Sequence, residues 1–521
     1  MMMDFSTLFA DRQLPSRDSN RLKWFLIGFI VVVVCIHLLS LTIYPQVFID
    51  EGWFANTSWS WLKTGIVFDT IHTGPLDQFG DPWVTDNFLA QLPYMLMYRI
   101  AGVGLFQTRL VSWAFGVVLL VATAQVGKRL YSLNTGLVAA LLLSLSLPFL
   151  DSSRIRQDIV LATMIMSSFW LSMYGFETER LWAHFLAGLI LGLGFDVQQS
   201  SIVFIPPLAA LYLFHYRARI LFKRGTWAVG VGGALGLGYY VVSHVLPNSE
   251  VYSKLMSFYF VSDADSRVPL TNPDILLESA IREVARYRFR SNLFDLGMII
   301  VGGLFLLLRR RKSDFVLLTF TGSAFVSFIL LSSNKTTLYA INLYPFFMLV
   351  VAAGFVAALH RWQGKNLARV IGAALVVFTV YCASQVSSLI YSNRDYDYYA
   401  ITDQMRDVIP ADKRVLGMPT WWLGFVEYDY RSSLSVPYYR FFNDYDVNQA
   451  MEALRPDYII VDDAQGAVLA DEGQTLPQGM NVYRVPREEF VTFLETRTEL
   501  VLDVLNLRNN HVQVYKVNWD E

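Results

Sequence analysis

Two adjacent carboxylates, Asp50 and Glu51, follow the first long apolar stretch of the chain. A charge drawn into a low-dielectric site has to be neutralised or paired with a cation, so two neighbouring acids at a membrane surface carry an energetic cost. The pair is therefore a candidate active site. It could equally mark a boundary between membrane and water, where acidic residues are common, and the pair alone does not decide between these interpretations.

A second group of charged side chains has the residue types of a phosphate site. Arg154, Arg156 and Asp158 lie close together in the sequence, and Lys335 lies in a separate polar segment. Arginine suits a phosphate because its planar fork can bind two oxygens at once, and lysine adds a point charge. Tyr344 is a further candidate ligand, or else an aromatic residue of the membrane boundary. The arginines could instead pair with neighbouring acids at an exposed turn, an arrangement worth little.

The composition is that of a membrane protein. Of the 521 residues, 54% are hydrophobic, 15% aromatic and 17% charged, which is too apolar for an ordinary soluble domain. The net charge of −2 argues against a nucleic-acid partner. The two cysteines, Cys35 and Cys382, lie in apolar stretches, which argues against a disulfide framework. We therefore expect a polytopic α-helical protein embedded in a lipid bilayer.

Apolar stretches of bilayer length predict about eleven transmembrane helices within a membrane domain over residues 24–390. The predicted spans are 24–44, 105–127, 133–150, 157–175, 182–196, 199–215, 226–246, 292–308, 314–332, 338–359 and 370–390.

The distribution of Lys and Arg predicts the orientation of these spans. Basic residues recur in alternate loops, as the positive-inside rule requires when the N-terminal segment 1–23 is cytoplasmic. An odd number of spans then places the loops 45–104 and 247–291 and the segment 391–521 outside, in a multi-pass protein of the inner (plasma) membrane. The three cations named above also fall on the outer side, against the positive-inside bias, so each calls for a functional reason.

Two outer segments have their own secondary-structure signals. Residues 53–62 carry bulky side chains at helical spacing and end at Gly65, which predicts a short helix in the membrane interface. Segment 391–521 reads as a small extracytoplasmic α/β domain. Its predicted strands are 413–419, 456–462 and 511–517, with a helix over 447–454.

Together these motifs resemble the GT-C glycosyltransferases, in particular the protein O-mannosyltransferases and the aminoarabinose transferase acting on lipid A. The resemblance covers roughly residues 20–390. The chain departs from the family where relatives carry a Lys-Pro pair, since it has His72 to Pro75, and where they carry Thr-Lys, since it has Gln198 and Gln199. The matching motifs are Asp50-Glu51, Gly74-Pro75, Pro93-Tyr94, Arg154-x-Arg156-x-Asp158, Lys335-x-x-x-Tyr339 and Leu343-Tyr344-Pro345.

The resemblance implies transfer of a sugar from a polyprenyl-phosphate donor to a lipid, glycan or protein acceptor on the outer face, without a nucleotide. Asp50 would be the general base that takes the proton of the acceptor hydroxyl, and the anomeric carbon would be inverted. Glu51 and Asp158 would be the further catalytic carboxylates, setting the field around Asp50 or orienting the arginines.

The same resemblance assigns the cations to the donor phosphate. Arg154, Arg156 and Lys335 would offset the charge of the departing phosphate, with Tyr344 as a further ligand. The chain would then be a hexosyl- or pentosyltransferase of the mannosyltransferase-like kind. The alternative is a transporter or flippase of a lipid-linked saccharide, which would carry charged residues deep within its spans. A third possibility is a membrane anchor whose C-terminal segment binds a partner.

The sequence does not name the sugar or the acceptor, and it gives no certain cofactor. Residues 72–86 offer His and Asp side chains, but their spacing matches no recognisable metal site, so we predict no metal ligands. A requirement for a divalent metal is left open.

Overall fold

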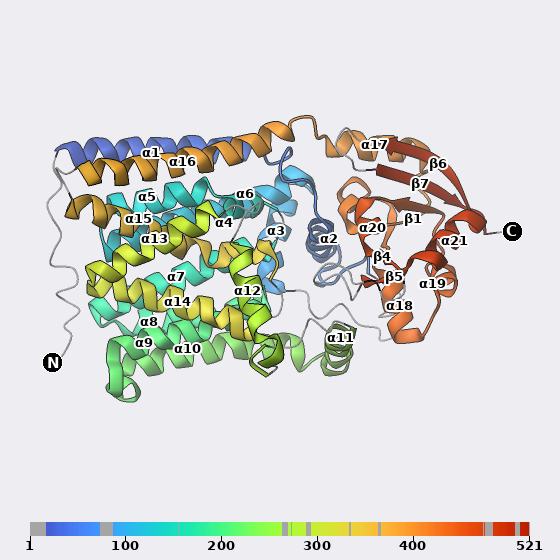
Figure 1. The fold of residues 1–521 in the computed structure, drawn as a ribbon. Helices are drawn as coiled ribbons and strands as arrows, with labels where there is room; N and C mark the ends of the chain where they lie inside the picture. Colours follow the sequence, from blue (N-terminus) through green and yellow to red (C-terminus); the bar gives the residue numbers. More distant parts are fainter. Residues whose placement is uncertain are drawn as a thin grey trace.

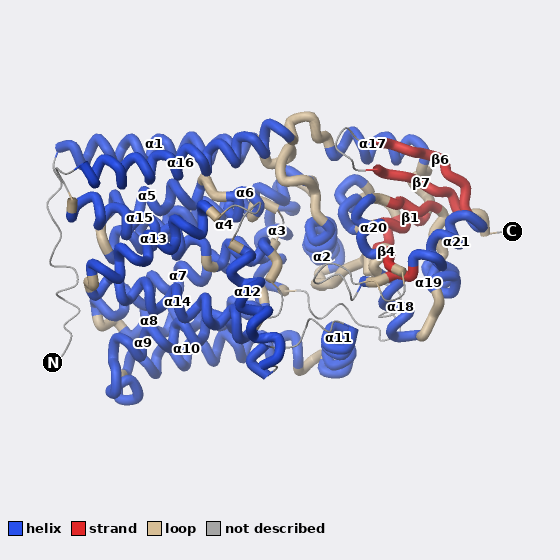
Figure 2. Tube along the Cα trace, viewed as in Figure 1, coloured by secondary structure: helices blue, strands red, loops and turns tan. Residues whose placement is uncertain are grey.

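The computed structural model shows a long helical bundle, with a smaller mixed α/β region at one end and helix α2 between them (Figure 1). Among the described residues, the strands all lie in that smaller region (Figure 2). The structure describes residues 17–72, 87–154, 156–262, 269–271, 273–287, 293–332, 335–362, 366–471, 474, 483–505 and 511–519.

The bundle confirms the predicted polytopic helical fold class. Each predicted span corresponds to one of its helices. Seven helices in the described part of the chain are long and apolar enough to cross a membrane, and α5 and α8 are shorter apolar helices. The number of spans therefore stays a prediction. The bundle helices are α1 (Arg17–Leu39), α4 (Leu105–Leu130), α5 (Leu133–Ser144), α7 (Gln157–Thr178), α8 (Leu181–Val197), α9 (Ile205–Tyr216), α10 (Arg224–Tyr240), α13 (Phe294–Arg309), α14 (Lys312–Leu331), α15 (Tyr344–Arg361) and α16 (Asn366–Ser392).

Helices α7 and α15 form the centre of the bundle. In each, 78% of the most apolar stretch is buried, which fits helices that are hydrophobic on every side. Helix α15 carries Pro345 in its first turn, where the missing N–H of proline has no cost. Helix α7 follows Arg156, and the short 3₁₀ segment η10 (Thr337–Asn342) before α15 packs against it. The central helices therefore bring residues 156–158 and 335–342 together.

Helix α2 (Ile49–Thr64) confirms the predicted short helix after the first span. It ends at Gly65, whose φ of 79° is the left-handed conformation that glycine adopts without strain. Asp50 and Glu51 lie in its first turn, where acidic residues are favoured by the helix dipole. Helix α3 (Phe88–Ala101) packs beside α2 at the end of the bundle (Figure 1).

The C-terminal region is built on a five-stranded sheet of order β2-β1-β3-β7-β6. Strand β1 pairs in parallel with β2 and β3, whereas β7 runs antiparallel to β3 and β6. The predicted strands β1, β3 and β7 and the predicted helix α19 are all present, while the boundaries of the domain stay a prediction. The elements are α17 (Tyr398–Val408), β1 (Arg414–Gly417), η11 (Pro419–Gly424), β2 (Asp429–Ser432), α18 (Ser435–Asn443), α19 (Val447–Leu454), β3 (Tyr458–Val461), α20 (Asp463–Val468), β4 (Leu469–Ala470), β5 (Val485–Pro486), α21 (Arg487–Arg497), β6 (Thr498–Leu505) and β7 (His511–Val517).

The C-terminal region packs directly on α2 through the 3₁₀ segment η11. Trp421 and Trp422 of η11 are almost fully buried in a core that also includes Ala55 and packs against Trp59 of α2. Farther along, the backbone N–H of Ser432 donates to the carbonyl of Ile71 at 2.7 Å, which joins the end of β2 to the loop after α2. Helix α2 is therefore held on both sides, by the bundle and by the C-terminal region.

Candidate functional site

Asp50, Arg156 and Asp158 meet where α2 approaches the start of α7. The guanidinium of Arg156 makes ion pairs with both carboxylates, and its Nε lies 2.6 Å from Oδ2 of Asp158. The Asp158 side chain is 3% exposed and that of Asp50 is 27% exposed, so the first is buried and the second reaches open space. Gln198 at the end of α8 donates to Oδ1 of Asp158 at 2.9 Å. These residues form the Asp50 cluster.

Arg154 lies beside this cluster and adds a second cation. Its guanidinium carbon is 5.4 Å from the centre of the Phe48 ring, and that of Arg156 is 5.9 Å from the same ring. Within the described part of the chain, its buried Nε has no hydrogen-bond partner. Of the local pairings considered from the sequence, Arg156 does pair with Asp158, but the pair is buried and not at an exposed turn, while Asp151 accepts from Tyr44 at 2.9 Å.

Lys335 and Tyr339 continue the site on the segment before α15. The Tyr339 ring centre is 5.9 Å from the Arg156 guanidinium. The Lys335 ammonium lies 3.3 Å from Oε2 of Glu283 and also donates to the carbonyl of Phe328. Burial lowers the pKa of Lys335 to about 8, against the opposing effect of the Glu283 charge.

Glu283 and Arg286 of helix α12 (Leu276–Arg286) form a second group of contacts with Lys335 and were missed from the sequence. The two side chains form an ion pair, both are almost fully buried, and Tyr287 donates to Glu283 at 3.0 Å. Among the described residues, Nε and Nη1 of Arg286 have no hydrogen-bond partner. The arginines of segment 247–291 were the sequence signal that could have drawn attention to Glu283 and Arg286. Nothing in their spacing, however, predicts a contact with Lys335.

Counted together, the charges of these two groups and Arg154 leave an excess of positive charge. Four cations and three carboxylates give a net charge of +1, and two of the guanidiniums carry buried N–H groups without partners among the described residues. Such an arrangement suits a bound anion. The cations are Arg154, Arg156, Arg286 and Lys335, and the carboxylates are Asp50, Asp158 and Glu283.

Glu51 is separated from this cluster although it follows Asp50 in the sequence. Its carboxylate receives two hydrogen bonds from Arg109 of α4, at 2.8 and 2.9 Å, and both side chains have no exposed surface. Arg109 also donates to the carbonyl of Leu41 at 2.6 Å. This geometry makes Glu51 a residue that positions α2, and its predicted catalytic role stays a prediction. Arg109 could have been singled out from the sequence, because it is a lone arginine inside an apolar predicted span.

Tyr344 is likewise directed elsewhere. Its hydroxyl donates to Oδ1 of Asp295 in α13 at 3.0 Å, and both side chains are buried. This contact joins α15 to α13, so the predicted role of Tyr344 as a phosphate ligand has no support from its position. Gln199, just after α8, donates to Tyr240 at the end of α10 at 3.1 Å.

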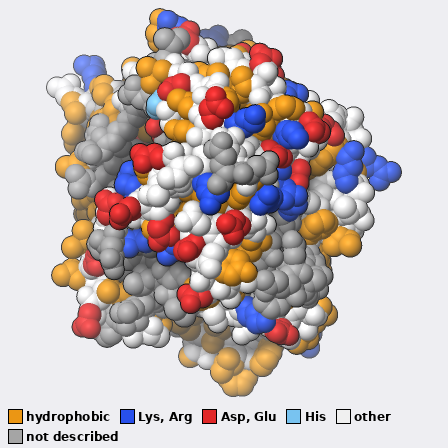
Figure 3. Space-filling view, turned by 90° about the vertical axis from the view of Figure 1, so that its right-hand side faces the viewer, with side chains coloured by type: hydrophobic (Ala, Val, Ile, Leu, Met, Phe, Trp, Pro, Cys, Tyr) orange, Lys and Arg blue, Asp and Glu red, His pale blue; other side chains and the backbone are white. Residues whose placement is uncertain are grey.

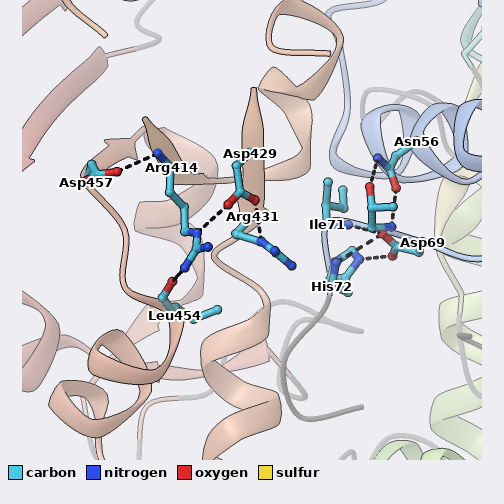
Figure 4. Close-up of polar contacts among 10 residues, drawn as sticks. Asn56, Asp69, Ile71, His72, Arg414, Asp429, Arg431, Leu454 and Asp457 are labelled. Carbon is cyan, nitrogen blue, oxygen red and sulfur yellow. Dashed lines mark hydrogen bonds and ion pairs between the residues drawn. The ribbon is translucent and has the colours of Figure 1, made fainter. Parts of the chain in front are cut away.

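Two further predictions concern parts of the loop after α2. No group of three or more His, Cys, Asp or Glu side chains that could hold a metal occurs among the residues the structure describes. The Gly74-Pro75 motif lies outside the described residues. His72, just before that motif, is buried and paired with Asp69 (Figure 4).

The similarities to known proteins agree with this architecture. A family model described as dolichyl-phosphate-mannose-protein mannosyltransferase matches residues 88–242, which include Arg154, Arg156 and Asp158. ArnT from Cupriavidus metallidurans bound to undecaprenyl phosphate superposes with a TM-score of 0.63 at 12% identity, over 94% of this chain and 97% of that chain. The chain has the GT-C fold.

A second solved structure with this fold comes from an archaeon. The oligosaccharyltransferase AglB from Archaeoglobus fulgidus, in complex with an inhibitory peptide and a dolichol-phosphate, superposes with a TM-score of 0.52 at 11% identity, over 85% of this chain and 70% of that chain. No curated protein matches the sequence. The GT-C resemblance predicted from the motifs is confirmed, and the chain is a multi-pass membrane protein.

Proposed function

We propose that the chain is an inverting glycosyltransferase that takes its sugar from a polyprenyl-phosphate donor. The observation that carries this proposal is the pairing of Asp50 with Arg156, whose guanidinium also pairs with the buried Asp158 and lies near the same Phe48 ring as Arg154. This pairing supports Asp50 as a base beside a phosphate held by the arginines. The two superposed GT-C proteins, one solved with undecaprenyl phosphate and one with a dolichol-phosphate, support a lipid phosphate as the ligand of these arginines.

The reaction can be written with the groups of the site. A hydroxyl of the acceptor gives its proton to Asp50 while its oxygen attacks the anomeric carbon of the donor sugar. The bond from that carbon to the phosphate oxygen breaks, and polyprenyl phosphate leaves with the electron pair. Attack from the face opposite the phosphate inverts the anomeric centre. General-base help of this kind is typically worth about 10²–10⁴ in rate.

The cations would act on the leaving phosphate. Arg154 and Arg286 offer buried N–H groups that have no partner among the described residues, and Lys335 adds a third charge. A phosphate near Arg156 would compete with Asp50 for its guanidinium, which would leave the carboxylate available to the acceptor hydroxyl. Fixed donors aimed at developing charge are commonly the largest contribution to such catalysis.

The proposal includes the location of the reaction. The candidate site lies at the end of the bundle that faces α2 and the C-terminal region (Figure 1). With the orientation predicted from basic loops, this end is the extracytoplasmic side of the inner (plasma) membrane. Charges gathered at one end of the helices fit transfer on one face better than movement of a lipid across both leaflets.

Replacement of Asp50 by asparagine tests the base assignment. The purified chain in lipid nanodiscs is supplied with a panel of undecaprenyl-phosphate sugars and membrane acceptor extract, and the undecaprenyl phosphate released is measured. We expect Asp50→Asn to bind undecaprenyl phosphate and to lose about 10²–10⁴ of the turnover rate. Asp412→Asn, an exposed aspartate of the C-terminal region, is the matched control and should behave as the original chain.

Full turnover by Asp50→Asn would rule out Asp50 as the base. Movement of lipid-linked saccharide across vesicles without any sugar transfer would instead favour the flippase alternative.

A further inference from the structure

A pocket with polar and aromatic walls lies away from the Asp50 cluster, between α2 and the C-terminal sheet. Its volume is about 390 Å³, in the range of small-molecule sites. One wall is the α2 face that carries Asn56, Ser60 and Lys63, and the opposite wall includes Asp429 and Arg431 of β2. Asp50 is not among the lining residues, so the pocket is distinct from the proposed transfer site.

Hydroxyl and amide groups line most of the α2 side. Thr70 and Asn56 hydrogen-bond to each other, with the Thr70 N–H donating to Oδ1 of Asn56 at 2.8 Å (Figure 4). Ser60 is 4% exposed, and its Oγ has no hydrogen-bond partner among the described residues. A buried hydroxyl without a partner costs free energy, which a hydrogen-bonding ligand would recover.

Two cations give the pocket a positive character. Arg431 donates through Nε to Asp429 at 2.9 Å, and Figure 4 shows its guanidinium extending toward the α2 side. Asp429 also accepts a hydrogen bond from Nε of Arg414 at 2.7 Å, so the one carboxylate among the described lining residues faces two arginines. Lys63 is exposed, with its ammonium 4.4 Å from the Trp59 ring centre, and it forms no ion pair within the described part of the chain.

This positive character belongs to the pocket and not to the whole surface. Figure 3 shows acidic and basic side chains interspersed over the face that the C-terminal region presents. A general electrostatic field therefore does not account for binding here, and selectivity would come from the groups that line the pocket. Neutral hydroxyls and an amide beside two cations match a ligand that is rich in hydroxyl groups and carries an anion.

We propose that the pocket between α2 and the C-terminal sheet, lined by Ser60, Lys63 and Arg431, binds an anionic saccharide as part of the acceptor. The assignment rests on the proposed function, because an acceptor is what a glycosyltransferase still needs once its donor is bound. Lys63 and Arg431 hold the anionic substituent, and the Ser60 hydroxyl bonds to a sugar hydroxyl. The packing of η11 on α2 then couples acceptor binding to the helix that carries Asp50.

Binding of defined oligosaccharides tests this proposal on the full chain in nanodiscs. The probes are hexagalacturonate, neutral maltohexaose and hexaglutamate, with affinity measured by isothermal titration calorimetry. We expect the chain to bind hexagalacturonate at least tenfold more tightly than either of the other two probes. The single variant Lys63→Gln and the double variant Lys63→Gln/Arg431→Gln should each weaken hexagalacturonate binding, the double variant by at least tenfold.

A matched control uses cations of the same region outside the pocket. The double variant Arg406→Gln/Lys413→Gln removes two partly exposed charges and should leave hexagalacturonate binding unchanged. Equal binding of hexaglutamate would overturn the saccharide assignment, and equal binding of maltohexaose would overturn the anionic one. Absence of any binding, or binding unaffected by Lys63→Gln and the double pocket variant, would overturn the site itself.

The same assay separates this proposal from the proposed transfer function. Asp50→Asn removes the proposed base but none of the pocket groups, so it should bind hexagalacturonate like the unaltered chain. Failure of Asp50→Asn to lose turnover would count against the base alone. Failure of hexagalacturonate to bind would count against the pocket alone.

Discussion

Lys335 is the cation of the site whose charge changes near neutral pH. Burial lowers its pKa to about 8, below the ordinary lysine value of 10.5, because the ammonium loses water that Glu283 replaces only in part. Below pH 8 the side chain is charged and can attract a phosphate. Above pH 8 it is neutral in the folded protein, and that attraction is lost.

We therefore predict that affinity for undecaprenyl phosphate falls as the pH rises from 7 to 9. Loss of one charge-assisted contact corresponds to about a tenfold increase in Kd. The second ionisation of a phosphate monoester, with a pKa of about 6, is largely complete by pH 7 and so contributes little in this window. Calorimetric titration of the chain in nanodiscs at the two pH values measures the effect.

Lys335→Gln provides the comparison for this pH effect. The variant should bind weakly at both pH values, because glutamine has no charge to lose. An unchanged affinity of the unaltered chain between pH 7 and pH 9 would show that Lys335 does not contact the phosphate.

At the scale of single residues, the sequence shows which side chains are charged but not which partners they have. Arg154, Arg156 and Lys335 were singled out in the sequence because cations in predicted outer loops run against the positive-inside bias. Glu51 was grouped with Asp50 because the two are adjacent, whereas its partner Arg109 lies 58 residues away. Successive side chains of a helix point in different directions, so adjacency within α2 separates the two carboxylates.

The Glu51–Arg109 pair joins two elements, α2 and α4. Both side chains are fully buried, and the paired hydrogen bonds fix the first turn of α2 against the bundle. Removing one partner of a buried ion pair leaves an uncompensated charge and typically costs about 3–5 kcal/mol. The pair thus sets the position of Asp50 without facing the Asp50 cluster.

We predict that Glu51→Gln and Arg109→Gln each lower the free energy of unfolding by about 3–5 kcal/mol. The double variant Glu51→Gln/Arg109→Gln should recover most of that loss, because two neutral amides can hydrogen-bond to each other without a buried charge. Thermal unfolding of the purified proteins, followed by tryptophan fluorescence, measures the three changes. A Glu51→Gln variant with normal stability and no turnover would instead support the predicted catalytic role of Glu51.

The elements themselves were largely predictable from hydropathy and turn residues. Local patterns of periodicity and glycine placement predict the spans, the end of α2 at Gly65, and the strands β1, β3 and β7. Strands β2, β4, β5 and β6 and helix α12 were missed. Strands β4 and β5 have only two residues each, and α12 lies in a loop whose mixed charges hide its two buried members, Glu283 and Arg286.

At the scale of the whole molecule, the C-terminal region forms the outer support of α2. No local pattern predicts this docking, because it depends on surfaces more than 300 residues apart in the sequence. Gly52 marks the closest approach. A methyl group added at Gly52 would lie 1.7 Å from the backbone oxygen of Pro419 in η11 and 2.6 Å from its carbonyl carbon. Neither backbone can yield without moving its whole element.

We predict that Gly52→Ala separates α2 from η11 and lowers both stability and turnover. Alanine in a helix interior is favoured over glycine by about 1 kcal/mol, whereas overpacking of a close contact typically costs about 1–3 kcal/mol. A net loss of stability would therefore be caused by the clash with Pro419, because the change in helix propensity alone would stabilise the protein. Turnover should fall as well, because Asp50 lies two residues before Gly52 on the same helix.

Gly466→Ala is the matched control for this contact. Gly466 lies in helix α20 of the same region, and a methyl group there meets no atom within 4 Å. This variant should be at least as stable as the unaltered chain and should keep its turnover. Limited proteolysis supplies a third measurement, since a C-terminal region displaced from α2 should be cut faster in Gly52→Ala than in Gly466→Ala. If the two variants unfold, turn over and resist protease alike, the C-terminal region does not support α2, and the position of Asp50 depends on the bundle and the Glu51–Arg109 pair alone.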